Sequence, residues 1–244
     1  MKNGLFFSIV IPTLNEAKYL PHLLTDLSLQ TYKDFEVIHI DGKSDDKTVE
    51  IASKFNVISK IVNVRNVSYQ RNAGAKLAKG KWIIFMDADN RIKDSFLEKI
   101  RSKLVVNKSI DLFTTLVKID ENEMIEKMTN FWLLFHDKFE NKAVFGSLIG
   151  VKTVFAKKFP FDEKQKLMED VIFVQNIINK GYIFKIFKYP RYLLSLRRIK
   201  SNGIPKTIKI IFRSSYNYYI NGKDFKNDNF DYEMNGGTIY SNNE

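Results

Sequence analysis

Two carboxylates that follow a fully apolar segment are the residues of this chain best placed to do chemistry. Asp87 and Asp89 flank Ala88 directly after residues 82–86, Trp-Ile-Ile-Phe-Met. A short run that is apolar on both faces predicts a buried strand of a parallel sheet, and ligands bind just beyond the carboxyl ends of such strands. Because two adjacent carboxylates repel each other, they favour a divalent cation shared with substrate phosphates. The pattern indicates a phosphorylated, nucleotide-linked substrate, although Asp and Asn also form ordinary turns.

Two more polar segments follow predicted strands and are expected at the same edge of the sheet. The loop Pro12-Thr13-Leu14-Asn15-Glu16 comes after a strand predicted over residues 8–11, which stops at Pro12. Its backbone and Glu16 could surround a nucleoside, or it could be only a turn that caps the next helix. Asp41 follows a strand predicted over residues 35–40. There it could accept a hydrogen bond from a base or a ribose hydroxyl, or simply form an Asp-Gly turn.

Arg71 and the pair Glu169-Asp170 lie on predicted helices and complete the set of candidates. Arg71 is in the helix predicted over residues 68–79, and its guanidinium could hold phosphate through two hydrogen bonds or lie in solvent. Glu169 and Asp170 open a helix predicted over residues 168–179, where the helix dipole alone favours acids. In the functional interpretation Asp170 is a general base for an attacking hydroxyl, and Glu169 orients it or binds the acceptor.

The elements that must position these residues alternate between strand and helix over the first hundred residues. Apolar periodicity predicts helices over residues 17–29, 68–79 and 94–106, and short strands over 8–11, 35–40, 61–64 and 81–86. We expect Gly80 to end the second helix as a left-handed cap, and Ser44 to cap a helix that follows Asp41. This rhythm is typical of an α/β fold with a mostly parallel central sheet flanked by helices.

After residue 110 the rhythm changes, and the sequence predicts a second half of the same domain. We expect a strand over residues 111–119, a strand-like segment over 145–155, a loop over 157–163 and an amphipathic helix over 204–220. A long helix over residues 123–139 is expected to face inward through Ile125, Met128, Trp132, Phe135 and Phe139. We predict one domain over residues 1–220, with a nucleotide-binding half (1–110) and an acceptor-binding half (111–220), and a loosely ordered tail over 221–244.

Composition and charge narrow the class of protein and its partners. The 244 residues include no cysteine, which excludes disulfides and thiolate metal sites, and no run of about 18 apolar residues that would span a bilayer. The first apolar run does not resemble a signal peptide, so we expect a cytoplasmic protein, or one peripheral to the inner face of the cell membrane. The net charge of +11, with six basic residues and no acid from Arg197 to Arg213, favours a phosphate-rich substrate, an anionic membrane or nucleic acid. The helix over 204–220 either packs on the sheet, which we favour, or lies on such a membrane.

Taken together, the motifs resemble the family 2 glycosyltransferases of GT-A fold. The similar segments occur in family order and are residues 8–16, 41–48, 70–74, 78–89, 161–163 and 169–170. Each motif is modest, but the ordered set is specific. The resemblance implies a GT-A (Rossmann-like) fold and metal-dependent transfer of a sugar from a nucleotide diphosphate to an acceptor, with inversion at the anomeric carbon.

The resemblance also implies roles for the candidate residues. Those expected to bind the nucleotide sugar are Pro12, Thr13, Asn15, Glu16, Asp41, Arg71, Asp87, Ala88, Asp89, Arg197 and Arg198. Asp87 and Asp89 would lie at the diphosphate with Mn²⁺ or Mg²⁺, and Asp89 is the expected direct ligand. Asp170 would be the base, with Glu169 beside it. Residues 195–198 resemble a C-terminal signature of some members, whose arginines would close over the diphosphate or face a membrane.

The expected substrates follow from the same set of residues. We expect a UDP- or GDP-sugar as donor and no nucleic acid as partner. Because a phosphate acceptor is already ionised and needs no base, a hydroxyl acceptor such as a lipid-linked sugar or glycolipid is favoured over a polyprenyl phosphate. A sugar nucleotidyltransferase is less favoured, since Pro12–Glu16 contains no glycine-rich phosphate loop. Lys158-Phe159-Pro160 stands where many members carry a glycine pair, so the details of their acceptor loop are not carried over.

Overall fold

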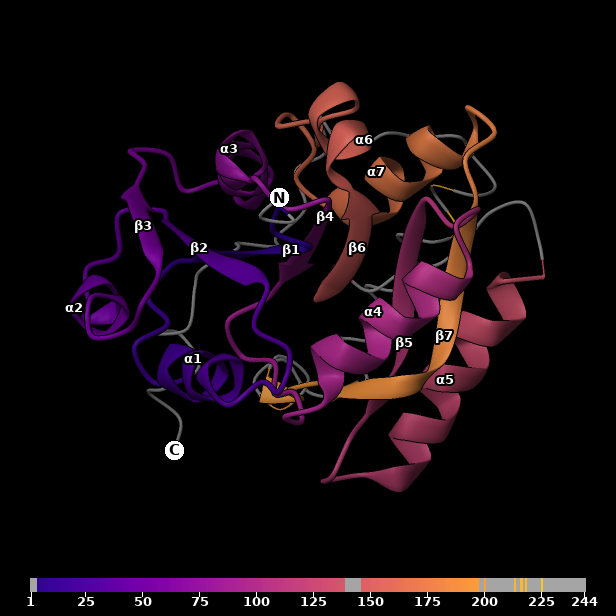
Figure 1. The fold of residues 1–244 in the computed structure, drawn as a ribbon, viewed down its shortest axis with the longest axis horizontal. Coiled ribbons are helices and arrows are strands. Elements are labelled where there is room, and N and C mark those ends of the chain that lie inside the picture. The colour runs from indigo at the N-terminus through magenta and orange to yellow at the C-terminus, as the bar shows by residue number, and fades with distance from the viewer. Residues whose placement is uncertain are drawn as a thin grey trace.

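The computed structural model describes residues 4–138 and 146–197, together with residues 200, 213, 216, 218 and 225. Within these residues a sheet of seven strands runs in the order β3-β2-β1-β4-β6-β5-β7, and helices cover both of its faces (Figure 1). Every strand pair is parallel except those of β6, which is antiparallel to both β4 and β5. The predicted α/β fold with a mostly parallel sheet is therefore confirmed.

The elements alternate along the chain in the expected βα rhythm. The strands are β1 (Phe7–Thr13), β2 (Phe35–Asp41), β3 (Ile58–Ile61), β4 (Trp82–Met86), β5 (Leu112–Lys118), β6 (Leu148–Lys152) and β7 (Phe184–Leu193). The helices are α1 (Leu20–Ser28), α2 (Thr48–Ala52), α3 (Val67–Leu77), α4 (Phe96–Val106), α5 (Glu123–His136), α6 (Thr153–Lys158) and α7 (Glu169–Ile178). None of the helices in the described ranges is long and apolar enough to span a bilayer.

The order of the strands places a ligand crevice at the carboxyl ends of β1 and β4. The chain adds β2 and β3 on one side of β1 and then returns to add β4 on its other side. A reversal of this kind opens a crevice where the loops diverge. The register sets Thr13 beside Asp41, whereas the pairing of β1 with β4 ends at Val10. Pro12, which lacks an N–H, is therefore tolerated inside β1, and the strand continues to Thr13 instead of stopping at Pro12.

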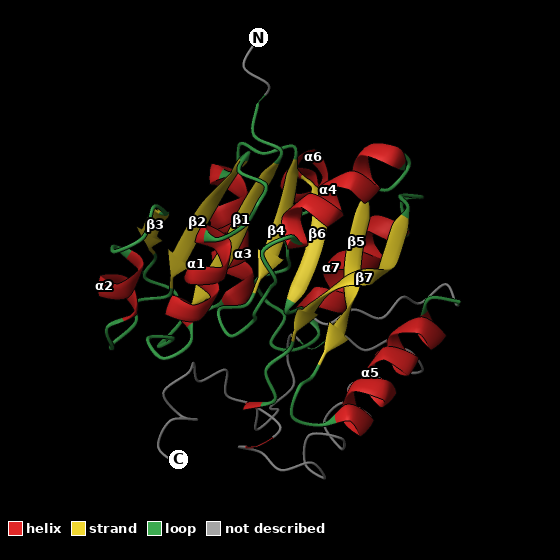
Figure 2. Ribbon diagram, turned by 60° about the horizontal axis from the view of Figure 1, so that its bottom comes forward, coloured by secondary structure: helices red, strands yellow, loops and turns green. Residues whose placement is uncertain are grey.

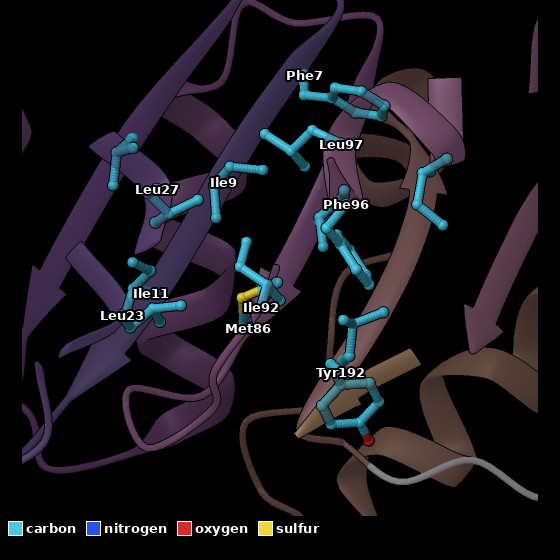
Figure 3. Packing of buried hydrophobic residues seen from close by; sticks show 14 of the residues in the cluster. Phe7, Ile9, Ile11, Leu23, Leu27, Met86, Ile92, Phe96, Leu97 and Tyr192 are labelled. Atoms are coloured by element: carbon cyan, nitrogen blue, oxygen red, sulfur yellow. The ribbon is translucent and has the colours of Figure 1, made fainter. Parts of the chain in front are cut away.

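Alternate residues of β1 enter two separate cores. Phe7, Ile9 and Ile11 pack with leucines of α1 and with Phe96 and Leu97 of α4 on one face (Figure 3). The side chain of Val10 enters the other face, which α3, α6 and α7 cover. Figure 2 shows these two helix layers on either side of the yellow sheet. Because each apolar face is closed by helices, the strand ends are held rigidly enough to position side chains at the crevice.

Several elements differ from the sequence-based expectation, mostly at the edges of the sheet. β3 begins and ends three residues before the predicted segment 61–64. The prediction missed its bounds because all four residues of β3 are exposed and carry no apolar pattern. β7 was not predicted, since lysines interrupt its apolar residues and a proline lies in its middle. The strand expected over 145–155 is confined to β6, and α6 occupies residues expected to be strand and loop. The helix expected over 204–220 lies outside the described residues except at 213, 216 and 218.

The inward side of α5 agrees only in part with the prediction. Its buried residues are Glu126, Asn130 and Leu133. Ile125 and Trp132 are partly buried and pack against the cores as expected, whereas Met128 and Phe135 are exposed and Phe139 lies outside the described residues. The side-chain amide of Asn130 bonds both the N–H and the carbonyl of Val117, at 2.9 Å each. Polar groups, which a search for apolar periodicity ignores, therefore decide which side of α5 faces inward.

Gly80 is required by close packing and not by a left-handed cap. The helix α3 ends at Leu77, and the cap residue Ala78 is extended, with φ −59° and ψ 130°. Of the glycines in the described residues, only Gly181, after α7, has a positive φ. A Cβ built on Gly80 would lie 2.5 Å from the carbonyl carbon of Phe7 and 2.6 Å from the nitrogen of Ser8. Gly80 therefore lets the loop before β4 press against the β1 backbone.

Substitution of Gly80 by alanine tests this close approach. We expect Gly80→Ala to lower the free energy of unfolding by about 1–3 kcal/mol, the usual cost of overpacking, because the obstructing atoms are backbone. Denaturant unfolding of the purified variant measures the loss. Gly4→Ala is the matched control, since a Cβ there would meet nothing within 4 Å. Equal stability of the two variants would contradict the packing explanation.

Candidate active site

Five of the six acidic side chains singled out in the sequence, all except Asp41, converge at the carboxyl edge of the sheet. Asp87 and Asp89 follow β4, Glu16 lies in the loop after β1, and Glu169 and Asp170 open α7. Two arginines join them: Arg71 contacts Asp87 and Glu169, and Arg197 contacts Glu16 and Asp89. The carboxylates therefore belong to one site, not to separate surfaces.

Arg71 is the buried centre of this site. Only 2% of its side chain is exposed, and its guanidinium donates to Glu169 Oε1 at 3.0 Å, to Asp87 Oδ1 at 3.2 Å and to the carbonyl of Gly146 at 3.0 Å. The ring of Phe161 covers the group, with 5.3 Å from the guanidinium carbon to the ring centroid. The neighbouring carboxylates raise the pKa of Arg71 against the effect of burial. The expected contact with phosphate stays a prediction, because the protein's own acids use this guanidinium.

Asp170 has the surroundings of a general base. Its carboxylate is half-buried, and Oδ1 accepts from the backbone N–H of Val171 at 2.8 Å. Burial raises the pKa of Asp170 to about 7, and the adjacent Glu169 adds to the rise while Arg71 opposes it. A Cβ on Gly146 would lie 2.8 Å from Asp170 Oδ2, so the backbone reaches the carboxylate only because residue 146 is glycine. A carboxylate of this pKa can take a proton near neutral pH.

Arg197 bridges the loops that follow β1 and β4. Its two terminal nitrogens donate to the two oxygens of Glu16 at 2.6 and 2.7 Å, and Nε lies 2.8 Å from Asp89 Oδ2. The ring of Tyr19 lies under the guanidinium, 4.6 Å from its carbon to the ring centroid. Burial raises the pKa of Glu16 to about 7, although Arg197 opposes the rise. Arg198, the other arginine of this segment, lies outside the described residues.

Asp41 is fully buried and organises the loop after β2. It accepts from the hydroxyl of Thr13 at 2.9 Å and from the backbone N–H and hydroxyl of Ser44 at 2.7 and 2.6 Å. Ser44 therefore serves Asp41 and caps no helix, since α2 begins only at Thr48. The Thr13 hydroxyl also lies 2.8 Å from Nε2 of His39, whose pKa burial lowers to about 4, so that the ring is neutral.

The remaining predicted residues lie in the loops that follow β1 and β4. Asn15 has a left-handed backbone, with φ 55°, and its side-chain oxygen accepts from the N–H of Asp45 at 2.8 Å. Ala88 is buried between the two aspartates of the D-x-D segment. Gln70 was not singled out in the sequence, yet its amide donates to the carbonyls of Thr13 and Ile40 at 2.7 and 2.8 Å. Gln70 opens the segment 70–74 that resembles a family motif, whereas Tyr19, His39 and Gly146 lie in no segment that would have identified them.

The charge of the site suits a cation that is held jointly with an anionic ligand. Five carboxylates face two arginines, so negative charges exceed positive ones by three when all are ionised. No group of three potential ligands in the described part of the chain could hold a metal by itself. Mg²⁺ and Mn²⁺ accept one or two carboxylates when phosphate oxygens complete their shell, so Asp87 and Asp89 fit such an ion.

The raised pKa of Asp170 predicts a pH dependence of the reaction. Below about pH 7 the carboxyl is protonated and cannot accept a proton, so we expect kcat/KM to rise as the pH passes upward through about 7. A pH–rate profile with saturating donor measures this limb. Glu16 has a similar pKa, so Glu16→Gln is the control, and its profile should keep the limb. Loss of the limb in that variant would assign it to Glu16.

Known proteins share this sequence pattern and fold. Residues 8–188 match the family model described as Glycosyl transferase family 2. An uncharacterized glycosyltransferase of Methanocaldococcus jannaschii is 31% identical over 235 residues, 90% of this chain and 79% of the relative. A dolichyl N-acetyl-α-D-glucosaminyl phosphate 3-β-D-2,3-diacetamido-2,3-dideoxy-β-D-glucuronosyltransferase of Methanococcus voltae is 26% identical, over 78% of this chain and 66% of the relative. Mycobacterium bovis PGL/p-HBAD biosynthesis glycosyltransferase is 38% identical over 95 residues, 36% of this chain and only 37% of its own length.

A solved structure supports the assignment of the fold. The mannosyltransferase PcManGT from Pyrobaculum calidifontis, solved in complex with GDP-Man and Mn²⁺, has a TM-score of 0.66 and 15% identity. The likeness covers 87% of this chain and 65% of that protein. At this identity it establishes the GT-A fold alone. With the family match extending over 8–188, most of the described residues, the chain belongs to glycosyl transferase family 2.

Proposed function

We propose that the protein is a metal-dependent inverting glycosyltransferase that moves a sugar from a UDP- or GDP-sugar to a hydroxyl acceptor. The observation that carries the proposal is the connection through Arg71. One buried guanidinium joins Asp87, expected at the diphosphate, to Glu169, the neighbour of the proposed base Asp170. The carboxylate expected at the departing diphosphate and the base expected to activate the attacking hydroxyl are thus held at a fixed distance from each other.

The donor side of the proposal rests on the acidic edge and its cation. A bound Mn²⁺ or Mg²⁺ would neutralise the charge that develops on the departing nucleotide diphosphate. Asp89 and Asp87 would hold the ion, and the loop with Pro12, Asn15 and Glu16 would surround the nucleotide. The mannosyltransferase of similar fold carries GDP-Man and Mn²⁺, which supports a nucleotide-sugar donor and a divalent ion here.

The acceptor side follows from Asp170. A hydroxyl gains nucleophilicity when a base takes its proton, and a carboxylate whose pKa is about 7 serves that purpose near neutral pH. Glu169, held by Arg71, fixes the start of α7 and with it the place of the base. The Methanococcus voltae relative is named as a transferase to a dolichyl-linked sugar phosphate, which supports a lipid-linked sugar as the acceptor class.

Two other functions fit the site less well. A polyprenyl-phosphate acceptor would leave the raised pKa of Asp170 without a purpose, because such a nucleophile is already ionised. A sugar nucleotidyltransferase would need a glycine-rich phosphate loop after its first strand, and β1 leads instead into a loop without glycine. A panel of UDP- and GDP-sugars, each tested with a hydroxyl acceptor and with a polyprenyl phosphate and read by the UDP or GDP released, separates these possibilities, because a nucleotidyltransferase would release neither.

Replacement of the proposed base tests the reaction type. We expect Asp170→Asn to lower kcat by about 10²–10⁴-fold, because the amide keeps the shape of the carboxyl but accepts no proton. Transfer from UDP- and GDP-sugars to octyl glycosides measures the loss. Binding of UDP or GDP with Mn²⁺, followed by thermal shift, should be unchanged in the variant.

Each part of that experiment has an outcome that would contradict the assignment it tests. Turnover retained in Asp170→Asn would refute the base assignment while leaving the donor assignment intact. Absence of stabilisation of the wild-type protein by either nucleotide with Mn²⁺ would refute the donor assignment. Transfer to a polyprenyl phosphate but to no hydroxyl would favour the second acceptor class.

The contacts of Arg197 predict that the binding of Mn²⁺ and the binding of the nucleotide are coupled. Because its guanidinium holds Asp89 in this structure, an ion at Asp89 must replace that contact. We expect Arg197→Gln to increase Mn²⁺ affinity in the absence of nucleotide by on the order of tenfold, a usual size for coupling between sites. The diphosphate offers Arg197 a new partner, so UDP or GDP should strengthen Mn²⁺ binding more in the wild type than in the variant.

Electron paramagnetic resonance of free Mn²⁺ measures this coupling without turnover. Lys200→Gln is the matched control, since Lys200 pairs with Glu121 on the surface. Equal Mn²⁺ affinity of the wild type and Arg197→Gln, with and without nucleotide, would contradict the competition at Asp89.

A further inference from the structure

The helix α5 presents four large apolar side chains to solvent. Met124, Met128, Phe131 and Phe135 are 66%, 60%, 70% and 47% exposed. They are spaced by four, three and four residues, so they form one continuous stripe along the helix. The rings of Phe131 and Phe135 stack with their centroids 6.1 Å apart. We call these four residues the α5 stripe.

The opposite side of α5 explains why the stripe stays outside. Glu126 accepts from the N–H of Ile119 at 2.9 Å and pairs with Arg191 and Lys118. Together with the two bonds from Asn130 to Val117, these contacts dock the helix on β5. Buried hydrogen-bonded groups of this kind are costly to expose, so α5 cannot turn to bury its apolar side. Contiguous exposed apolar residues mark an interaction surface.

We propose that the α5 stripe inserts into the surface of an anionic lipid bilayer. Lys127, which pairs with Glu123 at 2.8 Å, and Lys138 are exposed beside the stripe, one within the helix and one just after it. Lysine can cover the apolar boundary with its stem and reach lipid headgroups with its ammonium. Trp132, half-buried on the same helix, is a residue type that favours the membrane interface. The net charge of +11 adds a long-range attraction to anionic lipid.

A bilayer fits the stripe better than a second copy of the chain. A stable dimer buries roughly 800 Å² on each partner. Four side chains on a helix of 14 residues offer a smaller area than this. Insertion of one helix into a fluid interface, by contrast, needs no complementary partner surface, and its strength grows with apolar area and with basic charge.

The position of α5 connects the membrane to the site. β5 runs parallel to β4, because β6 is antiparallel to both, so β5 ends at the same edge of the sheet as the acids. The helix starts five residues beyond β5, and Figure 2 shows it standing off the side of β5 and β7. The next described residue after this segment is Gly146, whose carbonyl contacts Arg71. If the proposed function holds, the stripe therefore brings this edge to a lipid-linked hydroxyl acceptor.

Vesicle flotation of the full chain tests the proposal. We expect the wild type to float with phosphatidylcholine vesicles that contain phosphatidylglycerol, and to bind phosphatidylcholine alone much more weakly. Met128→Glu combined with Phe131→Glu should lower the partition coefficient by about tenfold or more, because carboxylates replace apolar groups at an anionic interface. Val106→Glu is the matched control, since Val106 is 87% exposed at the far end of α4 and should bind as the wild type does.

Tryptophan fluorescence gives a second measurement that needs no variant. The chain has two tryptophans, and Trp82 is buried in the core, so lipids brominated on their acyl chains should quench Trp132 alone. Quenching would show insertion of α5, whereas binding without quenching would mean adsorption by charge and would overturn the proposal. Flotation of the double variant at the wild-type level would overturn it as well.

The remaining outcomes also decide the question. If the wild type floats with no vesicle, the stripe is not a membrane surface. The same conclusion follows if lipid binding is absent and sedimentation shows a dimer that the double variant abolishes. Thermal stabilisation by UDP or GDP with Mn²⁺ is measured in the same samples. Its retention in a protein that fails to bind vesicles would refute the membrane surface and leave the proposed function standing.

Discussion

The burial of one guanidinium between two carboxylates governs the geometry of this protein's site. Arg71 comes from α3, Asp87 from the end of β4 and Glu169 from the start of α7, so the charge cluster ties three elements together across the sheet. Removal of one partner would leave a buried charge uncompensated, at a typical cost of about 3–5 kcal/mol. The distance between Asp87 and Glu169 is therefore fixed by the buried guanidinium of Arg71 that both carboxylates contact.

A second consequence of this arrangement is an excess of negative charge where an anionic donor is expected to bind. The two arginines are already engaged by carboxylates, so a diphosphate would meet repulsion without a further cation. A divalent ion resolves the conflict by binding both partners. Arg197 lies far along the chain from Asp89 and contacts it in this structure, so a cation at Asp89 would compete with this guanidinium.

The part of the sheet around β5 is built on a different principle. There α5 is held to the sheet by amide and carboxylate contacts with the β5 backbone, and its apolar side faces solvent. An ordinary surface helix does the reverse, because apolar burial is its main source of stability. Hydrogen bonds to β5 thus leave the apolar side of α5 exposed, and that exposure is the basis of the proposed lipid-binding surface.

The sequence by itself determined the βα order of the first hundred residues and the place of the D-x-D aspartates, because apolar periodicity and turn residues act locally. It also identified each acid of the site, and the ordered motifs indicated the family. Only the tertiary structure decided that Arg71 meets Glu169, 98 residues away, and that Arg197 meets Glu16, 181 residues away. The same holds for β7, for the buried side of α5 and for the role of Gly80. Such contacts depend on strand order and on polar groups that meet across the sheet, and no local periodicity records either.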